Sequence, residues 1–436
     1  MLAQLRSRCA TAAIALLASG CGSSSSSSSS GPPTMTTGSG GDSGSGSGGT
    51  TAGTGGPGGS TGVGGVRGTG GDASPDASAR DAGTDGTSAT APDAAIPDAR
   101  PSSDAGTPSV RFVGRIDRTN AAGAKFAWPG TTVLARFTGS TIGVRLSGPT
   151  AYFDVSIDGV AQPAPLVLIA GKTDYPLATG LSAGPHELSV YRRNEAGIAG
   201  TGDTTFLGLI LDPAGALLAP TPPAARRIEI VGDSITTGYG DQSVNGACPN
   251  VLAAQDHDVA FGADAARALG ADLITIAWTA KGMYRNNGGD MTDTMPILYG
   301  RTLPDQTTDT WDFTSWIPDA VVIYLGNNDF GRGDPGQPYV TAYEAFIARV
   351  RSHYPNALIV CTIGPNLADP KLSQERAYVK AIVAATVAAG DNKVDFLEMP
   401  QPTAAEGTGC GGHPLASTHK RMGDALVAEL KTRLAW

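Results

Sequence analysis

The segment Ile228-Glu-Ile-Val-Gly-Asp-Ser-Ile-Thr236 predicts how the second half of the chain folds. It begins with an apolar run, Ile228–Val231, which is typical of a buried strand, and it then passes through glycine to Ser234. Four more apolar runs follow, at residues 273–278, 320–325, 357–362 and 394–397, and helical patterns fall at residues 260–269, 340–353, 372–389 and 415–430. This alternation predicts an α/β fold whose parallel sheet is covered by helices on both faces. Ligands of such sheets bind beyond the carboxyl ends of the strands, which is where Ser234 lies.

Residues 108–220 have a different pattern. Apolar and polar residues alternate in five short runs, at residues 132–137, 142–146, 152–157, 186–191 and 205–211, and Asp158-Gly159 supplies a turn. No convincing helical pattern occurs before residue 220. We therefore expect an antiparallel β-sandwich, similar to a jelly roll, followed by an α/β domain at residues 225–436.

The first 107 residues predict export and a tether. Arg6 and Arg8 precede an apolar stretch, residues 10–18, that is too short to span a bilayer, as in a signal peptide. Residues 16–21 resemble the lipobox of bacterial lipoproteins, so residues 1–21 predict a signal peptide that ends at a lipidated Cys21. The alternative is an ordinary cleaved signal. Residues 22–107 are rich in Ser and Gly and predict a disordered linker.

We expect an exported protein that contacts a membrane only through this lipid, as an outer-membrane or cell-surface lipoprotein, or else a secreted protein. The net charge of −9 argues against a nucleic-acid partner. No cluster of His and Asp has the spacing of metal ligands, so no metal and no cofactor are expected.

Polar residues follow four of the predicted strands. Besides Ser234, the segments are Thr279-Ala-Lys-Gly282, Gly326-Asn-Asn-Asp329 and Gly409-Cys-Gly-Gly-His-Pro414. A serine hydroxyl is a weak nucleophile and needs a base within hydrogen-bond reach, which His413 can supply near neutral pH. The surroundings of Ser234 differ from the Gly-x-Ser-x-Gly elbow of α/β-hydrolases.

In this order the four segments resemble the blocks of the SGNH (GDSL-like) hydrolases, which have a flavodoxin-like sheet. The resemblance implies that Ser234 is the nucleophile and His413 its base. It also implies an oxyanion hole formed by the N–H groups of Ser234 and Gly282 and the side chain of Asn328. We expect Asp233 to brace the loop. His419, on the helix after the site, is expected at the surface.

Cys410 stands where the SGNH pattern usually places an aspartate that orients the histidine ring. A conventional triad is therefore doubtful, and a backbone carbonyl or a more distant acid such as Glu406 could take that place. Cys248 and Cys410 lie in Gly-rich loops and could form a disulfide bond in an exported protein, the alternative being two free thiols. Cys361 lies in an apolar run and is expected in a buried strand.

Three segments of the β-domain, Arg111–Asp117, Phe126–Gly130 and Tyr152–Val155, look like the N-terminal domain of carbohydrate esterase family 2. The catalytic half adds matching segments at Gly238–Gly240 and Gly409–Pro414. The resemblance covers everything after the linker. It implies that an acetylated carbohydrate of xylan or mannan type is the substrate, and that a Ser–His dyad removes its acetyl groups. Two alternatives remain: a non-catalytic glycan-binding surface lipoprotein, and an esterase of lipids or aryl esters.

Overall fold

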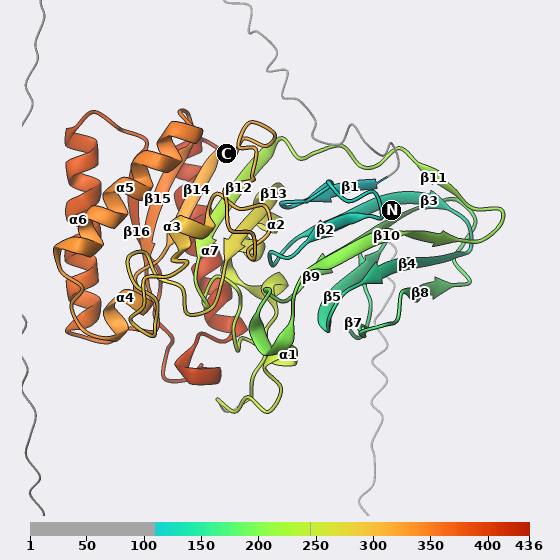
Figure 1. The fold of residues 1–436 in the computed structure, drawn as a ribbon, viewed down its shortest axis with the longest axis horizontal. Helices are drawn as coiled ribbons and strands as arrows, with labels where there is room; N and C mark the ends of the chain where they lie inside the picture. Colours follow the sequence, from blue (N-terminus) through green and yellow to red (C-terminus); the bar gives the residue numbers. More distant parts are fainter. Residues whose placement is uncertain (1–109, 245) are drawn as a thin grey trace, which may run out of the picture. The chain divides into compact units, whose positions relative to one another are not determined.

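A computed structural model describes residues 110–244 and 246–436 of the chain (Figure 1). The predicted signal peptide, Cys21 and the linker at residues 22–107 lie outside the described residues.

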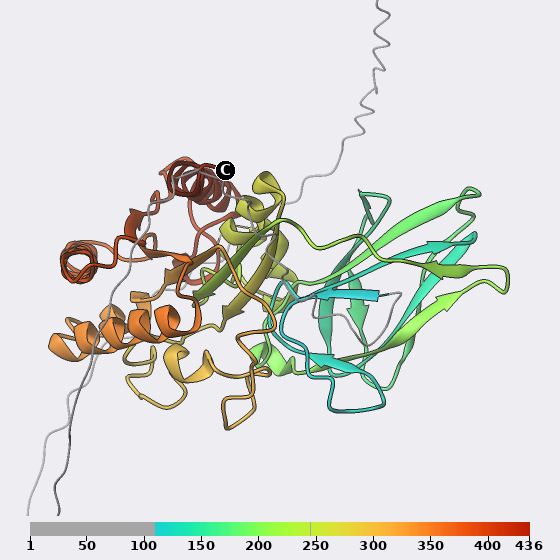
Figure 2. The same ribbon diagram turned by 90° about the horizontal axis from the view of Figure 1, so that it is seen from above.

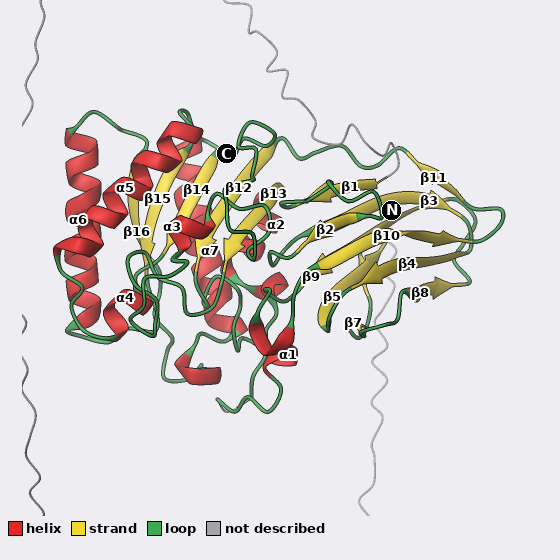
Figure 3. Ribbon diagram, in the orientation of Figure 1, coloured by secondary structure: helices red, strands yellow, loops and turns green. Residues whose placement is uncertain are grey.

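The strands of the first domain form two antiparallel sheets (Figure 3). One sheet contains β1 (Val110–Val113), β3 (Thr132–Thr138), β9 (Pro185–Arg192), β5 (Ala151–Ile157) and β6 (Val160–Ala161), with β11 (Ala216–Leu218) on β3 and β7 (Leu166–Leu168) on β5. The other contains β2 (Ala124–Phe126), β10 (Thr204–Leu211), β4 (Thr141–Ser147) and β8 (Asp174–Thr179).

The predicted alternation explains this packing. In β5, every second residue from Ala151 to Ile157 is buried, and the residues between them are half-buried. Side chains from both sheets share one core, where Phe126 of β2 meets Phe153 of β5 with ring centroids 6.4 Å apart. The predicted β-sandwich is therefore correct.

The second domain has one parallel sheet of five strands in the order β13-β12-β14-β15-β16. The strands are β12 (Arg226–Gly232), β13 (Ala271–Ala277), β14 (Ala320–Tyr324), β15 (Leu358–Ile363) and β16 (Val394–Glu398). In chain order this is 2-1-3-4-5, the order of a flavodoxin-like sheet, which the resemblance to SGNH hydrolases implies. Ligands of such a sheet bind where the strand order reverses, beside the ends of β12 and β14.

Helices cover both faces of this sheet (Figure 2). The longer helices are α2 (Phe261–Leu269), α5 (Gln337–His353), α6 (Lys371–Ala388) and α7 (Ala416–Leu434), and the short ones are α1 (Val251–Ala254), α3 (Met295–Leu298) and α4 (Asn327–Gly331). Single-turn 3₁₀ helices are η1 (Ile198–Gly200), η2 (His257–Val259) and η3 (Cys410–Gly412). Among the described residues, no helix is both long and apolar enough to cross a membrane.

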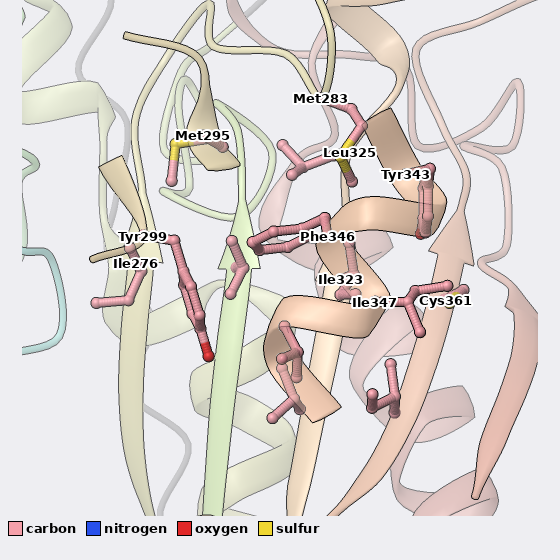
Figure 4. Packing of buried hydrophobic residues seen from close by; sticks show 14 of the residues in the cluster. Ile276, Met283, Met295, Tyr299, Ile323, Leu325, Tyr343, Phe346, Ile347 and Cys361 are labelled. Atoms are coloured by element: carbon pink, nitrogen blue, oxygen red, sulfur yellow. The ribbon is translucent and has the colours of Figure 1, made fainter. Parts of the chain in front are cut away.

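Alternate side chains of one strand point to the two opposite faces of the sheet. Val321 and Ile323 of β14 pack beneath α5 and α6, whereas Val322 packs beneath α2 and α7. Figure 4 shows the layer between the sheet and α5, in which Phe346 of α5 lies beside Ile323. Apolar side chains cover both faces, which is why each strand reads as a continuous apolar run. The same layer contains Cys361, which is buried in β15 as predicted.

The two domains share buried contacts. Trp128 of the sandwich belongs to the core beneath α5 and donates its indole N–H to the carbonyl of Thr302 at 2.9 Å. Arg115 of the sandwich is fully buried against Glu229 of β12, with nitrogen and oxygen 3.3 Å apart. A buried charge is tolerated only when it is paired, so this contact ties the sandwich to β12, an inner strand of the sheet.

Candidate active site

Ser234 follows the end of β12 in a tight turn. A Cβ atom on Gly232 would lie 1.9 Å from Thr236 Oγ1, so only glycine fits where the strand leaves the sheet. Asp233 Oδ1 accepts the N–H of Ile235 at 3.0 Å, and Thr237 Oγ1 donates to the carbonyl of Ser234 at 2.9 Å. These bonds fix the turn, and the Asp233 bond agrees with the bracing role expected from the sequence.

The structure brings His413 to Ser234. His413 Nε2 lies 2.7 Å from Ser234 Oγ, and Nδ1 lies 2.8 Å from the carbonyl oxygen of Cys410. A carbonyl oxygen only accepts hydrogen bonds, so Nδ1 must carry the proton and Nε2 presents its lone pair to the serine hydroxyl. Burial also lowers the pKa of His413 below its ordinary value, which keeps the imidazole neutral and ready to accept a proton.

Within the part of the chain that the structure describes, no carboxylate contacts the His413 ring. Glu406, the distant acid considered from the sequence, instead pairs with Arg421, with oxygen and nitrogen 2.6 Å apart, and also accepts the backbone N–H of Thr403 at 2.8 Å. The backbone carbonyl of Cys410 takes the position of the missing carboxylate. The two residues are therefore arranged as a dyad.

The loop that carries His413 is held at several points. Cys248 and Cys410 form a disulfide bond, with Cα atoms 5.6 Å apart, which is the pairing considered from the sequence. Ser243 Oγ accepts the N–H of Cys410 at 3.0 Å. A Cβ atom on Gly240 would lie 2.6 Å from Cys410 Cβ, so the loop packs directly on the backbone after the nucleophile.

Ser234 and His413 line a pocket of about 630 Å³. Its wall includes residues that follow three of the strands and residues at the start of α6, among them Tyr239, Thr279, Ala280, Asn328 and Lys371. The ring centroid of Tyr239 lies 4.7 Å from that of His413. The pocket thus lies at the edge of the sheet where the strand order reverses.

Asn328 lines this pocket from the first turn of α4. Its Nδ2 donates to the carbonyl of Lys281 at 2.8 Å and to Asp233 Oδ2 at 3.3 Å. Asp233 is fully buried, and burial raises its pKa to about 7. The amide group of Asn328 is therefore held at the pocket wall by the nucleophile turn on one side and the loop after β13 on the other.

Gly282 is not at the pocket wall. It is buried, and its N–H donates to Asn286 Oδ1 at 3.2 Å. A Cβ atom there would lie 2.0 Å from the carbonyl oxygen of Arg285, so close packing of the loop accounts for the glycine. The structure thus does not place this N–H, expected in the oxyanion hole, beside Ser234.

Ala280 lines the pocket instead. Its φ of +68° is unusual for alanine. Among the described residues, neither the N–H of Ala280 nor that of Ser234 donates a hydrogen bond, so both are available to a ligand in the pocket. Sequence reasoning missed this residue because it looked for a glycine. The distance from the end of the strand could have identified it, because Ala280 is only three residues beyond the end of β13.

His419 was predicted at the surface, and this prediction is wrong. The side chain is fully buried, its ring stacks on Phe261 of α2, and Nδ1 accepts the Phe261 N–H at 3.2 Å. The start of α7 packs on α2, and residue 419 lies on the side of the helix that α2 covers. Within residues 110–244 and 246–436, no group of three or more His, Cys, Asp or Glu side chains could hold a metal ion.

Known proteins resemble both halves of the chain. Residues 112–222 match the family described as carbohydrate esterase 2 N-terminal, and residues 230–421 match the GDSL-like lipase/acylhydrolase family. The cellulase/esterase CelE of Acetivibrio thermocellus is 36% identical over 76% of this chain, which spans 40% of the length of that protein. An acetylxylan esterase/glucomannan deacetylase of Cellvibrio japonicus is 27% identical over 76% of this chain and 91% of its own length.

Among solved structures, a family two carbohydrate esterase from Clostridium thermocellum in complex with cellohexaose is 35% identical. The match covers 75% of this chain and 99% of that chain, with a TM-score of 0.71.

Proposed function

The chain belongs to carbohydrate esterase family 2, and from that premise we propose that Ser234 and His413 remove O-acetyl groups from xylan- or mannan-type polysaccharides. The observation that carries the proposal is the 2.7 Å contact between Ser234 Oγ and His413 Nε2 at the wall of an open pocket. A neutral imidazole that faces a serine hydroxyl is the arrangement that activates serine for acyl transfer.

In the first step Ser234 Oγ bonds to the carbonyl carbon of the acetyl group, and its proton moves to His413 Nε2. The bond from that carbon to the sugar oxygen then breaks, and Nε2 gives the proton to the departing oxygen. The acetyl group remains on Ser234 as an ester. In the second step water bonds to the acetyl carbon and gives a proton to Nε2. The bond from that carbon to Ser234 Oγ then breaks, Nε2 returns the proton to Oγ, and acetic acid leaves.

The negative charge of each tetrahedral intermediate needs fixed donors. The pocket wall offers the N–H groups of Ser234 and Ala280 and the amide of Asn328. The Asn328 amide can exchange its 3.3 Å hydrogen bond to Asp233 for a hydrogen bond to the oxyanion. Its 2.8 Å hydrogen bond to the carbonyl of Lys281 is then retained. Each such donor is worth about 3 kcal/mol in the transition state.

Hydrolysis of p-nitrophenyl acetate and of acetylated xylan by Ser234→Ala and His413→Ala tests the assignment. Both variants should lose at least about a thousandfold in kcat, because either change removes the activated nucleophile. Ser352→Ala is the matched control, since Ser352 is exposed on α5. Wild-type rates in either site variant would overturn the proposal.

A fluorophosphonate probe separates catalysis from simple glycan binding. It should label the wild-type protein at Ser234 and leave Ser234→Ala unlabelled. Acyl-chain length separates an acetyl esterase from an esterase of lipids: kcat/KM should fall steeply from p-nitrophenyl acetate to the butyrate. A panel of acetylated xylan, mannan and cellulose then identifies the polysaccharide.

We further propose that Cys21 is acylated after export and that the linker at residues 22–107 separates the esterase from the membrane. The support is the sequence pattern before Cys21. Expression of the full chain in a bacterium with lipoprotein processing should place it in the membrane fraction, and Cys21→Ala should move it to the soluble fraction. An unchanged distribution would contradict the anchor.

A further inference from the structure

Glu195 is a residue of the sandwich whose side chain enters the α/β domain. It follows β9 by three residues and is 1% exposed. One carboxylate oxygen accepts the backbone N–H of Thr279 and the other accepts the Thr279 hydroxyl, so the carboxylate holds this residue at two points. Thr279 lines the pocket and directly precedes Ala280.

The same carboxylate reaches the nucleophile turn. Glu195 Oε1 accepts the side-chain N–H of Gln255 at 2.9 Å, and the same Gln255 nitrogen donates to Thr237 Oγ1 at 2.8 Å. Thr237 Oγ1 donates in turn to the carbonyl of Ser234 at 2.9 Å. One buried carboxylate of the sandwich therefore connects the Ser234 turn with the loop after β13.

The placement is costly for folding. Burying a carboxylate away from water is unfavourable unless hydrogen bonds compensate, and burial raises the pKa of Glu195 to about 7. A neutral side chain could fill the space between the domains without this cost. What the carboxylate alone provides is two acceptor oxygens for two donors of the same residue. They fix the Trp278–Thr279 peptide and the Thr279 side chain, directly before the peptide that carries the Ala280 N–H.

We propose that Glu195 is a positioning residue for the esterase reaction: it fixes Thr279 so that the Ala280 N–H stays at the pocket wall as an oxyanion donor. The inference rests on the proposed function, because it assigns a role within the same site. It gives the sandwich a part in catalysis in addition to any contact with the polysaccharide.

Glu195→Gln tests the proposal, because glutamine has nearly the same shape but only one acceptor oxygen for the two Thr279 donors. We expect kcat for p-nitrophenyl acetate to fall about 10- to 100-fold while KM changes less than about twofold, since an oxyanion donor acts in the transition state only. The rate of Ser234 labelling by the fluorophosphonate should fall in parallel. Thr279→Val, which keeps the backbone N–H, should lose less activity than Glu195→Gln.

Asp272→Asn is the matched control. Asp272 lies at the opposite end of β13 and pairs with Arg111 of the sandwich at 2.9 Å, so the variant also removes a carboxylate from the contact between the domains. It should lower Tm and leave kcat unchanged. Equal kcat losses in Asp272→Asn and Glu195→Gln, or wild-type kcat in Glu195→Gln, would overturn the inference. Where Glu195→Gln does not fold, Thr279→Val decides by its own kcat, and wild-type kcat there overturns the inference as well.

Failure of the proposed function gives a different result. Retained activity in Ser234→Ala would reject Ser234 as the nucleophile, and with it the proposed reaction, whatever Glu195→Gln does. An inactive Ser234→Ala beside a fully active Glu195→Gln rejects only the positioning role.

Discussion

His413 Nδ1 lies 2.8 Å from the carbonyl oxygen of Cys410, the same residue whose sulfur is joined to Cys248. The group that sets the tautomer of the base is therefore part of a backbone that a covalent bond holds in place. A carboxylate would add its own negative charge to stabilise the imidazolium, whereas a carbonyl offers only a dipole. The dyad consequently depends on the position of the Cys410 peptide more than on electrostatics.

The first prediction concerns this disulfide bond. Cys248→Ser/Cys410→Ser should lower the free energy of unfolding by about 2–5 kcal/mol, because the bond restrains the unfolded chain. It should also lower kcat by roughly tenfold, since small displacements of a catalytic group are costly. Urea unfolding and p-nitrophenyl acetate hydrolysis measure the two effects.

A reducing agent supplies the control for the disulfide. It should reproduce both effects in the wild-type protein and change nothing in the double variant. An unchanged unfolding midpoint in the double variant would mean that hydrogen bonds such as the one from Cys410 N–H to Ser243 hold the loop without the bond.

The pH dependence of the reaction follows from the burial of His413. Burial lowers the pKa of this imidazole, and only the neutral form can accept the Ser234 proton. The acidic limb of kcat/KM should therefore have its midpoint below about pH 6.5, the value of an ordinary histidine. A midpoint near 7 would instead implicate Asp233 or Glu195, since burial raises the pKa of each to about 7. In that case Asp233→Asn or Glu195→Gln would move the limb.

Asp233 also predicts how stability changes with pH. Burial raises its pKa from an ordinary 3.8 to about 7, so between these values the folded state keeps a proton that the unfolded state has lost. The contribution of Asp233 to the free energy of unfolding must therefore fall as pH rises through this range. Urea unfolding at several pH values should show a smaller fall in Asp233→Asn than in the wild type. Asp424→Asn, at an exposed residue of α7, is the control and should leave the slope unchanged.

Much of the fold could be predicted because local patterns reflect burial directly. The run Ala320–Leu325 is apolar throughout since both faces of the sheet are covered, and β14 occupies Ala320–Tyr324. Short elements such as β7 and α4 were missed, because three to five residues carry no clear period. His419 was misplaced because a helical period does not reveal that α2 packs against the side of α7 on which residue 419 lies.

The candidate site was predictable only where residue type and role coincide. A serine and a histidine after their strands carry their chemistry in their side chains, so Ser234 and His413 could be named. Ala280 acts through its backbone, and Glu195 acts across 84 positions of sequence through contacts that only the folded chain creates. Neither role leaves a pattern in the sequence.

The last prediction distinguishes Ala280 from Gly282 as the second backbone donor. Replacing residue 280 by lactic acid, with a suppressor tRNA, exchanges its N–H for an ester oxygen and keeps the methyl group. If the Ala280 N–H binds the oxyanion, kcat should fall about 10²- to 10³-fold with little change in KM. Glycolic acid at position 282 is the matched control, because it removes only the 3.2 Å bond to Asn286 and should cost far less. A large loss at 282 with wild-type kcat at 280 would return the role to Gly282, where the sequence first placed it.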